Sequence, residues 1–434
     1  MHIRGIDATY YTVLDLKTVA AFYSKILGEP TTSLEGRLAE WTLPDDNAFG
    51  LYGTPAKPAN RSGSVMFAVD DLDDAVRDSS AFENLRFGSA RLGVEAAAID
   101  GRTIRIRERT LFDKPFGRLV HFEVERAPAP PILVVAPLSG MSWHVLYDLV
   151  LGALPHFDVH VLGWSDAGDV PVQVGPFDLD DNIAYVVDAA RHLGAGFHLV
   201  GLCQSALPVL AAASILAAAG DPAEPESLVL IGGKLDTRIR PTRIDRLTRS
   251  RSLEEIERDL VTIVPAPRHG RGRRVYSAAT KWLMVATYLT RQLASGGELL
   301  AKMVLDDGVD PVGHPFIELF FSLADLPAEF FLDTVARVFH ESELPRGVMA
   351  WRGARVAPAK ISRAALLTIE GERDDISAPG QTCAAHELCA GIRSTRKAHF
   401  LCPDVGHFGL FHGAAFRREV LPRIRSFIRE VAVA

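Results

Sequence analysis

After residue 131, apolar residues recur as short continuous runs that alternate with stretches of helical spacing. Uninterrupted apolar runs are typical of strands that are buried on both faces of a parallel sheet. Because strand-like and helical segments alternate, the pattern predicts a doubly wound, mostly parallel α/β sheet. The expected strands are residues 132–138, 157–164, 197–203, 227–233, 365–372 and 398–403.

A long stretch between the fourth and fifth of these strands, about residues 237–360, breaks the rhythm. Its spacing is mostly helical, and it is rich in arginine and aromatic residues. We expect it to form a cap that excludes water from an active site and shapes substrate access. Its aromatic residues Phe320, Phe321, Phe330 and Phe331 are expected in the core of the cap, with a minority lining an acyl pocket.

The first part of the chain has a different pattern. Residues 5–14 alternate as a strand, residues 15–27 have helical spacing, and residues 64–82 resemble both again. This weak repeat predicts an N-terminal α+β domain of βαβββ type over residues 1–126. The proline-rich segment 127–131 is interpreted as a linker, which leaves residues 132–434 for the α/β domain.

Composition narrows the classes of function. The chain has 434 residues, 48% of them hydrophobic and 23% charged, with a net charge of −7. These values fit a globular protein of two domains, and they give no general reason to expect nucleic acid or an anionic membrane as partner. The N-terminus has no apolar run of signal-peptide type, so a cytoplasmic location is the default expectation. The sequence says nothing of the oligomeric state.

The segment Gly201-Leu202-Cys203-Gln204-Ser205 lies between an expected strand and an alanine-rich helix. This is the G-x-nucleophile-x-small pattern of the elbow in an α/β hydrolase, where small neighbours allow a strained turn. The N-terminus of the following helix favours a thiolate at Cys203. The alternative is a buried structural cysteine.

A base and its orienting acid are expected further along the chain, in the order nucleophile, acid, histidine. His407 follows the last expected strand, whereas His399 lies within that strand and is expected to be packed. Asp374 or Asp375 would hold the imidazole tautomer, and Asp374 is favoured because its spacing after the strand is the commoner one. The three groups would form a Cys–His–Asp relay for covalent acyl transfer.

An oxyanion hole is expected from backbone amides of Gln204 and of Met141, which follows the first strand of the α/β domain. The alternative for that loop is a simple turn at Ser139-Gly140. Trp143 and His144 lie nearby and are further candidates for the site.

These motifs resemble those of intracellular polyhydroxybutyrate depolymerases. The matching segments, in the family's order, are residues 114–122, 132–140, 175–186, 201–212, 235–242, 367–389 and 403–411. The resemblance implies an α/β-hydrolase fold, with Cys203 as nucleophile and Asp374 and His407 as its partners.

Two positions depart from the pattern of that family. Ser205 stands where the family usually has proline, and Met141 stands where it has histidine. The second departure puts the identity of the substrate in doubt rather than the triad.

Residues 1 to about 75 resemble the glyoxalase/bleomycin-resistance (vicinal oxygen chelate) module. Members that bind metal use His, Gln or Glu, but Ala8 and Ser64 occupy the expected ligand positions. His121 alone cannot hold an ion. The four cysteines also lack a CxxC pair and a zinc-like spacing, so we expect no metal and no cofactor. Residues 114–122 fit either the last strands of this module or the depolymerase-like part.

Three functions remain open at this point. The first is hydrolysis of 3-hydroxyacyl esters, polymeric or small, through an acyl-cysteine. The second is acyl transfer or thioester hydrolysis on a β-hydroxyacyl or polyketide-type group carried by coenzyme A or an acyl carrier protein. The basic run Arg268–Arg274 is either a solvated loop or a site for the phosphates of such a carrier. The third is a non-catalytic ligand-binding protein.

Overall fold

A computed structural model of the chain describes two compact units, which divide between Arg86 and Phe87; the larger one comprises Phe87–Ala278 and Phe321–Ala434. No helix among the described residues is long and apolar enough to cross a bilayer. The described residues are 3–13, 16–17, 20–21, 24, 29–34, 38–42, 48–53, 63–69, 92, 94–99, 102–139, 143–281 and 323–433.

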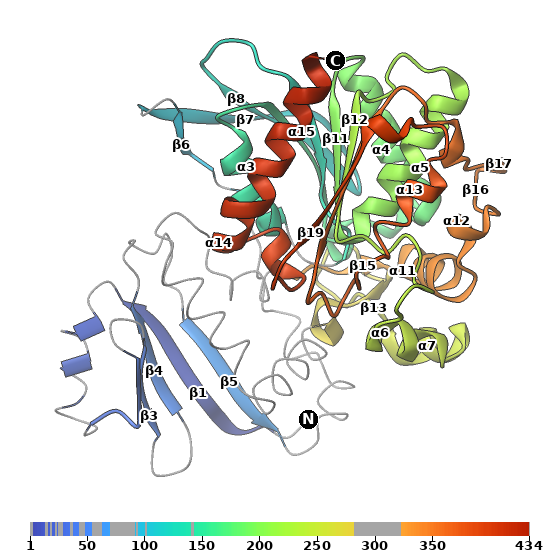
Figure 1. The fold of residues 1–434 in the computed structure, drawn as a ribbon. Helices are drawn as coiled ribbons and strands as arrows, with labels where there is room; N and C mark the ends of the chain where they lie inside the picture. Colours follow the sequence, from blue (N-terminus) through green and yellow to red (C-terminus); the bar gives the residue numbers. More distant parts are fainter. Residues whose placement is uncertain are drawn as a thin grey trace. The chain divides into compact units, whose positions relative to one another are not determined.

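The larger unit is built on a nine-stranded sheet of order β19-β18-β12-β11-β9-β10-β8-β7-β6 (Figure 1). All six strands expected from the apolar runs are present and pair in parallel with one another. Five of them, β9, β10, β11, β12 and β18, are buried along nearly their whole length, as continuous apolar runs require. Their bounds are β9 Pro131–Val135, β10 Asp158–Trp164, β11 His198–Leu202, β12 Ser227–Ile231, β18 Ala365–Gly371 and β19 Lys397–Cys402.

Residues 114–122, which by sequence fit either domain, belong to the sheet of the larger unit. Strand β8 (Gly117–Val124) pairs antiparallel with β10, and β7 (Arg102–Lys114) and β6 (Ala96–Ile99) extend the sheet beyond it. The proline-rich residues 127–131, expected as a linker between domains, therefore connect β8 to β9 inside one sheet. Local alternation predicts a strand but does not reveal which sheet it joins.

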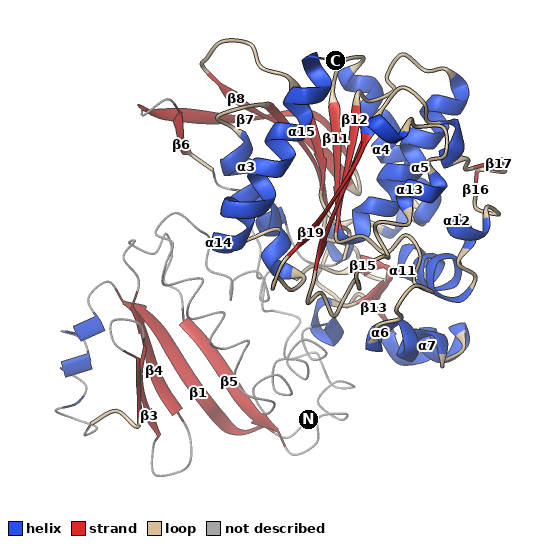
Figure 2. Ribbon diagram, viewed as in Figure 1, coloured by secondary structure: helices blue, strands red, loops and turns tan. Residues whose placement is uncertain are grey.

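Helices cover both faces of this sheet (Figure 2). Helices α3 (Tyr147–Ala153) and α15 (Leu421–Val433) pack together on one face, and α4 (Leu179–Leu193) and α5 (Ala206–Ala219) pack together on the other. This layered sheet, with its strand, tight turn and helix at β11, is an α/β-hydrolase fold. Short helices α13 (Ala385–Leu388) and α14 (Gly413–Ala415) follow β18 and β19.

The insertion between β12 and β18 is described at its two ends, 237–281 and 323–360; Phe320 and Phe321 lie outside the described residues. It contains short strands as well as the expected helices. Arg337 and Trp351 attach it to the start of α4 through the carboxylate and carbonyl of Asp180. Its elements are α6 Arg243–Arg249, α7 Leu253–Leu260, β13 Val261–Ile263, β14 Arg274–Tyr276, β15 Leu326–Pro327, α11 Ala328–Thr334, the π-helical η6 Val335–His340, α12 Glu343–Arg346, β16 Ala350–Trp351 and β17 Ala354–Arg355.

The smaller unit contains a five-stranded sheet of order β2-β3-β4-β1-β5, in which only β1 and β4 pair in parallel. Leu16, from the expected first helix, packs with Trp41 and Leu51 in its core. The helix expected near residues 73–82 lies outside the described residues. The strands are β1 Ile3–Val13, β2 Thr32–Leu34, β3 Leu38–Thr42, β4 Ala48–Gly53 and β5 Gly63–Val69.

Candidate active site

Cys203 lies directly after β11, in a single 3-10 turn (Cys203–Ser205) that leads into α5. Its φ of 51° is in the left-handed region, which a residue with a side chain adopts only under constraint. A Cβ on Gly233 would lie 2.2 Å from the Cβ of Ala206, so the chain beside the elbow has room only for glycine there. These features hold the thiol at the end of the strand, as an elbow requires.

Ser205 secures this turn through its hydroxyl, a contribution that its small size alone did not predict. The hydroxyl is buried, accepts a hydrogen bond of 2.8 Å from the Leu202 amide, and lies 2.8 Å from the Val135 carbonyl, to which it donates. Val135 ends the neighbouring strand β9. Ser205 therefore ties the elbow to the adjacent strand, in the position where the depolymerase pattern has proline.

His407 bridges the thiol and a carboxylate. Its Nε2 lies 3.1 Å from Sγ of Cys203, and its Nδ1 lies 2.7 Å from Oδ2 of Asp374. The imidazole is 4% exposed and packs edge-on against Phe408 and Phe411. Thus the structure brings three residues from separate loops into one hydrogen-bonded chain.

The structure distinguishes the two candidate aspartates. Asp374 is buried, and its Oδ1 accepts hydrogen bonds from the amides of Ile376 and Ser377, at 2.9 and 2.7 Å. Those two bonds leave Oδ2 directed at His407. The side chain of Asp375 is exposed and belongs to the surface.

Electrostatics in this buried chain favour a charged imidazole. Burial alone would lower the pKa of His407, but the negative charges of Asp374 and Cys203, and the hydrogen bonds to them, outweigh it and raise the pKa to about 10. A protonated His407 beside Cys203 is the partner that a nucleophilic thiolate needs.

The expected oxyanion hole is described only in part. Gln204 follows the nucleophile in the elbow, and its side-chain Oε1 accepts a hydrogen bond of 2.9 Å from the amide of Leu138. The side chain thereby joins the elbow to the loop after β9. Ser139 is half-buried at the end of the described part of that loop, and Gly140 and Met141 lie outside the described residues. Trp143 and His144 begin the 3-10 turn Trp143–Leu146.

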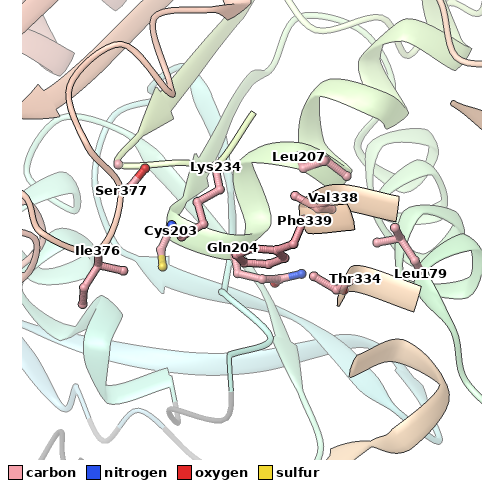
Figure 3. A pocket seen from close by; sticks show the side chains of 11 residues that line it. Leu179, Cys203, Gln204, Leu207, Lys234, Thr334, Val338, Phe339, Ile376 and Ser377 are labelled. Carbon is pink, nitrogen blue, oxygen red and sulfur yellow. The ribbon is translucent and has the colours of Figure 1, made fainter. Parts of the chain in front are cut away.

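A cavity of about 150 Å³ opens at Cys203 (Figure 3). Ile376 and Ser377, from the loop after β18, lie on one side of the thiol, and cap residues lie on the other. The wall is mainly apolar, with Gln204, Lys234, Thr334 and Ser377 as polar exceptions. The lining residues are Leu179, Cys203, Gln204, Leu207, Gly232, Lys234, Thr334, Val338, Phe339, Ile376 and Ser377.

Sequence reasoning missed three polar residues in this wall, Thr334, Lys234 and Ser377, and the last two have buried surroundings. Lys234 follows β12 and pairs with the fully buried Asp245, with Nζ 2.5 Å from Oδ1. Ser377 is fully buried, and its hydroxyl has no hydrogen-bond partner among the described residues. Position after a strand of the parallel sheet was a signal for both, since ligands bind beyond the carboxyl ends of such strands.

The basic run is not a solvated loop throughout. Arg268 forms ion pairs with Asp166 and Asp325, at 2.8 and 2.5 Å. Arg273 is buried and donates to the carbonyls of Val170, Pro171 and Gly175. Both side chains hold the run against residues 166–175, so these two guanidinium groups are already engaged within the protein.

One family model matches the chain. Residues 232–432 match the model described as the C-terminus of PHB de-polymerase, a segment that includes Asp374 and His407 but not Cys203. No curated protein matches the sequence.

Solved structures with a related fold are distant in sequence. A bacterial membrane phospholipase A is 15% identical, with 84% of this chain and 93% of that chain covered and a TM-score of 0.42. An esterase from Thermogutta terrifontis is 14% identical (77% and 98% covered, TM-score 0.42), and the α/β hydrolase GrgF from Penicillium sp. sh18 is 12% identical (76% and 99% covered, TM-score 0.44). Likeness of this degree says nothing about substrate.

Proposed function

We propose that the protein is a cysteine-dependent α/β hydrolase that cleaves a short 3-hydroxyacyl ester through an acyl-cysteine intermediate. The observation that carries this proposal is the chain of hydrogen bonds from Asp374 through His407 to Cys203 at the mouth of an apolar cavity. A nucleophile, a base in contact with it and a group that orients the base are the arrangement that covalent acyl transfer requires.

Each residue has a defined step. The Cys203 thiolate attacks the ester carbonyl, and the protonated Nε2 of His407 gives its proton to the leaving alcohol. Water then enters, loses a proton to Nε2 and releases the acid from Cys203. Asp374 keeps the proton of the imidazole on Nδ1 in the neutral state and stabilises the imidazolium. The backbone amide of Gln204, and one from the loop after β9, are proposed to bind the oxyanion.

The size of the cavity bears on the acyl group. An apolar cavity of 150 Å³ holds a molecule about as large as benzene, roughly six non-hydrogen atoms, and the cavity at Cys203 is about 150 Å³. A 3-hydroxybutyryl group is of that size. Its 3-hydroxyl would supply the hydrogen-bond partner that the Ser377 hydroxyl lacks among the described residues, once that buried hydroxyl turns toward the cavity.

The match of residues 232–432 to the depolymerase model supports the same class of ester substrate.

The test is mass spectrometry of the intact protein after brief incubation with short esters, with and without the 3-hydroxyl. We expect a single 3-hydroxyacyl adduct that maps to Cys203 and is absent from Cys203→Ala. Cys383→Ala is the matched control, because Cys383 is also half-buried but does not line the cavity. Full esterase activity in Cys203→Ala, or an adduct on another residue, would exclude the proposal.

Acyl transfer is a second candidate, and the apolar wall of the cavity favours it. Water has few hydrogen-bonding groups in such a wall, whereas a thiol or alcohol acceptor could displace it from the acyl-cysteine. Coenzyme A or an acyl carrier protein would then be donor or acceptor. A product assay in which an added thiol captures most of the acyl group would favour transfer over hydrolysis; unchanged release of free acid at high thiol concentration would argue against it.

A further inference from the structure

A second group of reactive side chains lies outside the cavity. Cys383 lies just before the short helix α13, and His386 is the second residue of that helix. His399 lies on β19. On the sheet below them, Thr368 of β18 is the direct neighbour of His399 in the strand pairing. None of these four residues lines the cavity at Cys203.

The donor atoms of these three side chains converge. One ligand atom from each of Cys383, His386 and His399 lies within 4.8 Å of the other two. Nε2 of His386 and Nδ1 of His399 lie 2.8 and 2.9 Å from the same atom, Oγ1 of Thr368. The two rings are nearly perpendicular, at 87°. Because an imidazole lone pair lies in the plane of its ring, two perpendicular rings that face one point direct both lone pairs at it.

A second cluster shows the opposite geometry. His121 and His160 lie near Asp158, but their rings are stacked at 4.3 Å with planes only 5° apart. Parallel stacked rings cannot point their lone pairs at one ion. The convergence at Thr368 is therefore a specific property of the first cluster and not of any two neighbouring histidines.

The two hydrogen bonds at Thr368 constrain how the rings are protonated. One hydroxyl carries one proton, so it can donate to only one of two neutral imidazole nitrogens that face it. Satisfying both nitrogens requires one ring to present an N–H, or a cation to take both lone pairs. A cation would also bind the sulfur of Cys383, with which the Thr368 hydroxyl can form only a weak hydrogen bond.

The surroundings hold these residues in place. The buried carboxylate of Glu370 accepts hydrogen bonds from the amides of Thr382 and Cys383, at 2.7 and 2.9 Å. It also lies 3.7 Å from Nε2 of His399, on the side of the ring away from Thr368. A carboxylate behind a histidine is a common support for a metal ligand. The side chain of His399 is 33% exposed, so an ion has access from solvent.

From this geometry we propose that Cys383, His386 and His399 form a zinc site, with water or the Thr368 hydroxyl as the fourth ligand. One sulfur and two imidazoles in a tetrahedral arrangement are donors that Zn²⁺ prefers. The sequence suggested no zinc-like spacing, because His399 joins the other two only through the pairing of β19 with β18.

Binding must release a proton. The thiolate and not the thiol is the form of Cys383 that binds a metal ion. Zn²⁺ forms a bond to sulfur as the S–H proton leaves to solvent, and the two imidazoles contribute lone pairs without losing a proton. We expect about one proton released per zinc bound at neutral pH.

The test uses the full chain with Cys203→Ser, so that the thiol at the candidate active site cannot bind metal. The metal-stripped protein is titrated with Co²⁺, whose thiolate charge-transfer band reports a Co–S bond, and Zn²⁺ is then added as competitor. Ligand variants are Cys383→Ser and His399→Asn, the second at a partly exposed position where little packing is lost. Cys402→Ser, a buried thiol on the same strand as His399, is the matched control.

We expect one Co²⁺ per chain with a thiolate band that Zn²⁺ removes, and affinity at least about 100-fold weaker in either ligand variant. Cys402→Ser should bind as the parent does. The proposal is overturned if no thiolate band appears, if the band survives Cys383→Ser, or if His399→Asn binds as tightly as the control. None of these outcomes depends on esterase activity, so they separate this proposal from the function proposed for Cys203.

Discussion

The replacement of Asp374 by asparagine tests the proposed triad most directly. Oδ1 of Asp374 accepts hydrogen bonds from the amides of Ile376 and Ser377, so an asparagine must turn its carbonyl oxygen to that side. Its NH₂ group then faces Nδ1 of His407, 2.7 Å away in the native pair. An NH₂ donor makes Nδ1 an acceptor, which places the ring proton on Nε2. In that tautomer Nε2 cannot take a proton from Cys203.

The magnitude follows from the electrostatics of the pair. The pKa of His407 is raised from 6.5 to about 10, and the charge of Asp374 is the largest favourable cause. At 1.36 kcal/mol for each pKa unit, the imidazolium is stabilised by several kcal/mol, on the order of 5. Asp374→Asn removes the larger part of this and also fixes the wrong tautomer. We expect kcat/KM to fall by about 10³- to 10⁴-fold, as for the loss of the orienting aspartate in other triads.

The assay measures kcat/KM for a short 3-hydroxyacyl ester and, in parallel, the rate at which iodoacetamide alkylates Cys203 across pH. Both should fall in Asp374→Asn, and the alkylation rate should recover at higher pH than in the parent. Asp375→Asn is the matched control, since its side chain is exposed and the carboxylate that faces Nδ1 of His407 is that of Asp374. The reasoning is refuted if Asp374→Asn keeps activity within about tenfold of the parent, or if the two variants behave alike.

Three further predictions concern stability and selectivity. The pKa of His407 is raised to about 10 in the folded protein, so its stabilising contribution is complete below pH about 6.5 and is lost as pH rises through 10. The free energies of unfolding of the parent and of His407→Gln, measured with denaturant, should therefore converge over that range. A constant difference between them would contradict this. Ser205→Ala leaves the buried amide of Leu202 without a partner and should lower the free energy of unfolding by about 1–3 kcal/mol. Ser214→Ala removes only a hydrogen bond to a carbonyl within its own helix and should lower it less. Equal losses of stability would show that the elbow does not need the Ser205 hydroxyl. Ser377→Ala should lower kcat/KM for 3-hydroxyacyl esters severalfold and leave acyl esters without that hydroxyl unchanged, and a uniform loss would instead indicate a structural role for the side chain.

The strands that carry the site follow from the sequence because their pattern is local. A strand buried on both faces must be largely apolar, and five of the six runs after residue 131 form such strands. The sixth, β19, lies at the edge of the sheet and is partly exposed. Strand β7 is different: it lies next to the edge strand β6, and it is mostly polar and partly exposed. It pairs with β8 and β6, and its own pattern of residues does not reveal those partners.

The cap shows the same division. Its extent could be inferred from the interruption of the strand rhythm, but its small sheet β13-β14-β15 could not, since strands of two or three residues carry no period. The basic run illustrates a further limit. Charge on a loop predicts exposure, whereas burial of Arg273 depends on three carbonyls about a hundred residues away in the chain.

By itself the sequence determined the types and order of the reactive groups: Cys203 in an elbow, then an aspartate pair, then His407. These depend on local turn geometry and chain order, which adjacent residues encode. Only the tertiary structure distinguished Asp374 from its neighbour, because burial and contact with His407 are decided by packing across the sheet. The convergence of Cys383, His386 and His399 likewise depends on the register of β18 and β19, a long-range pairing for which no single segment holds the signal.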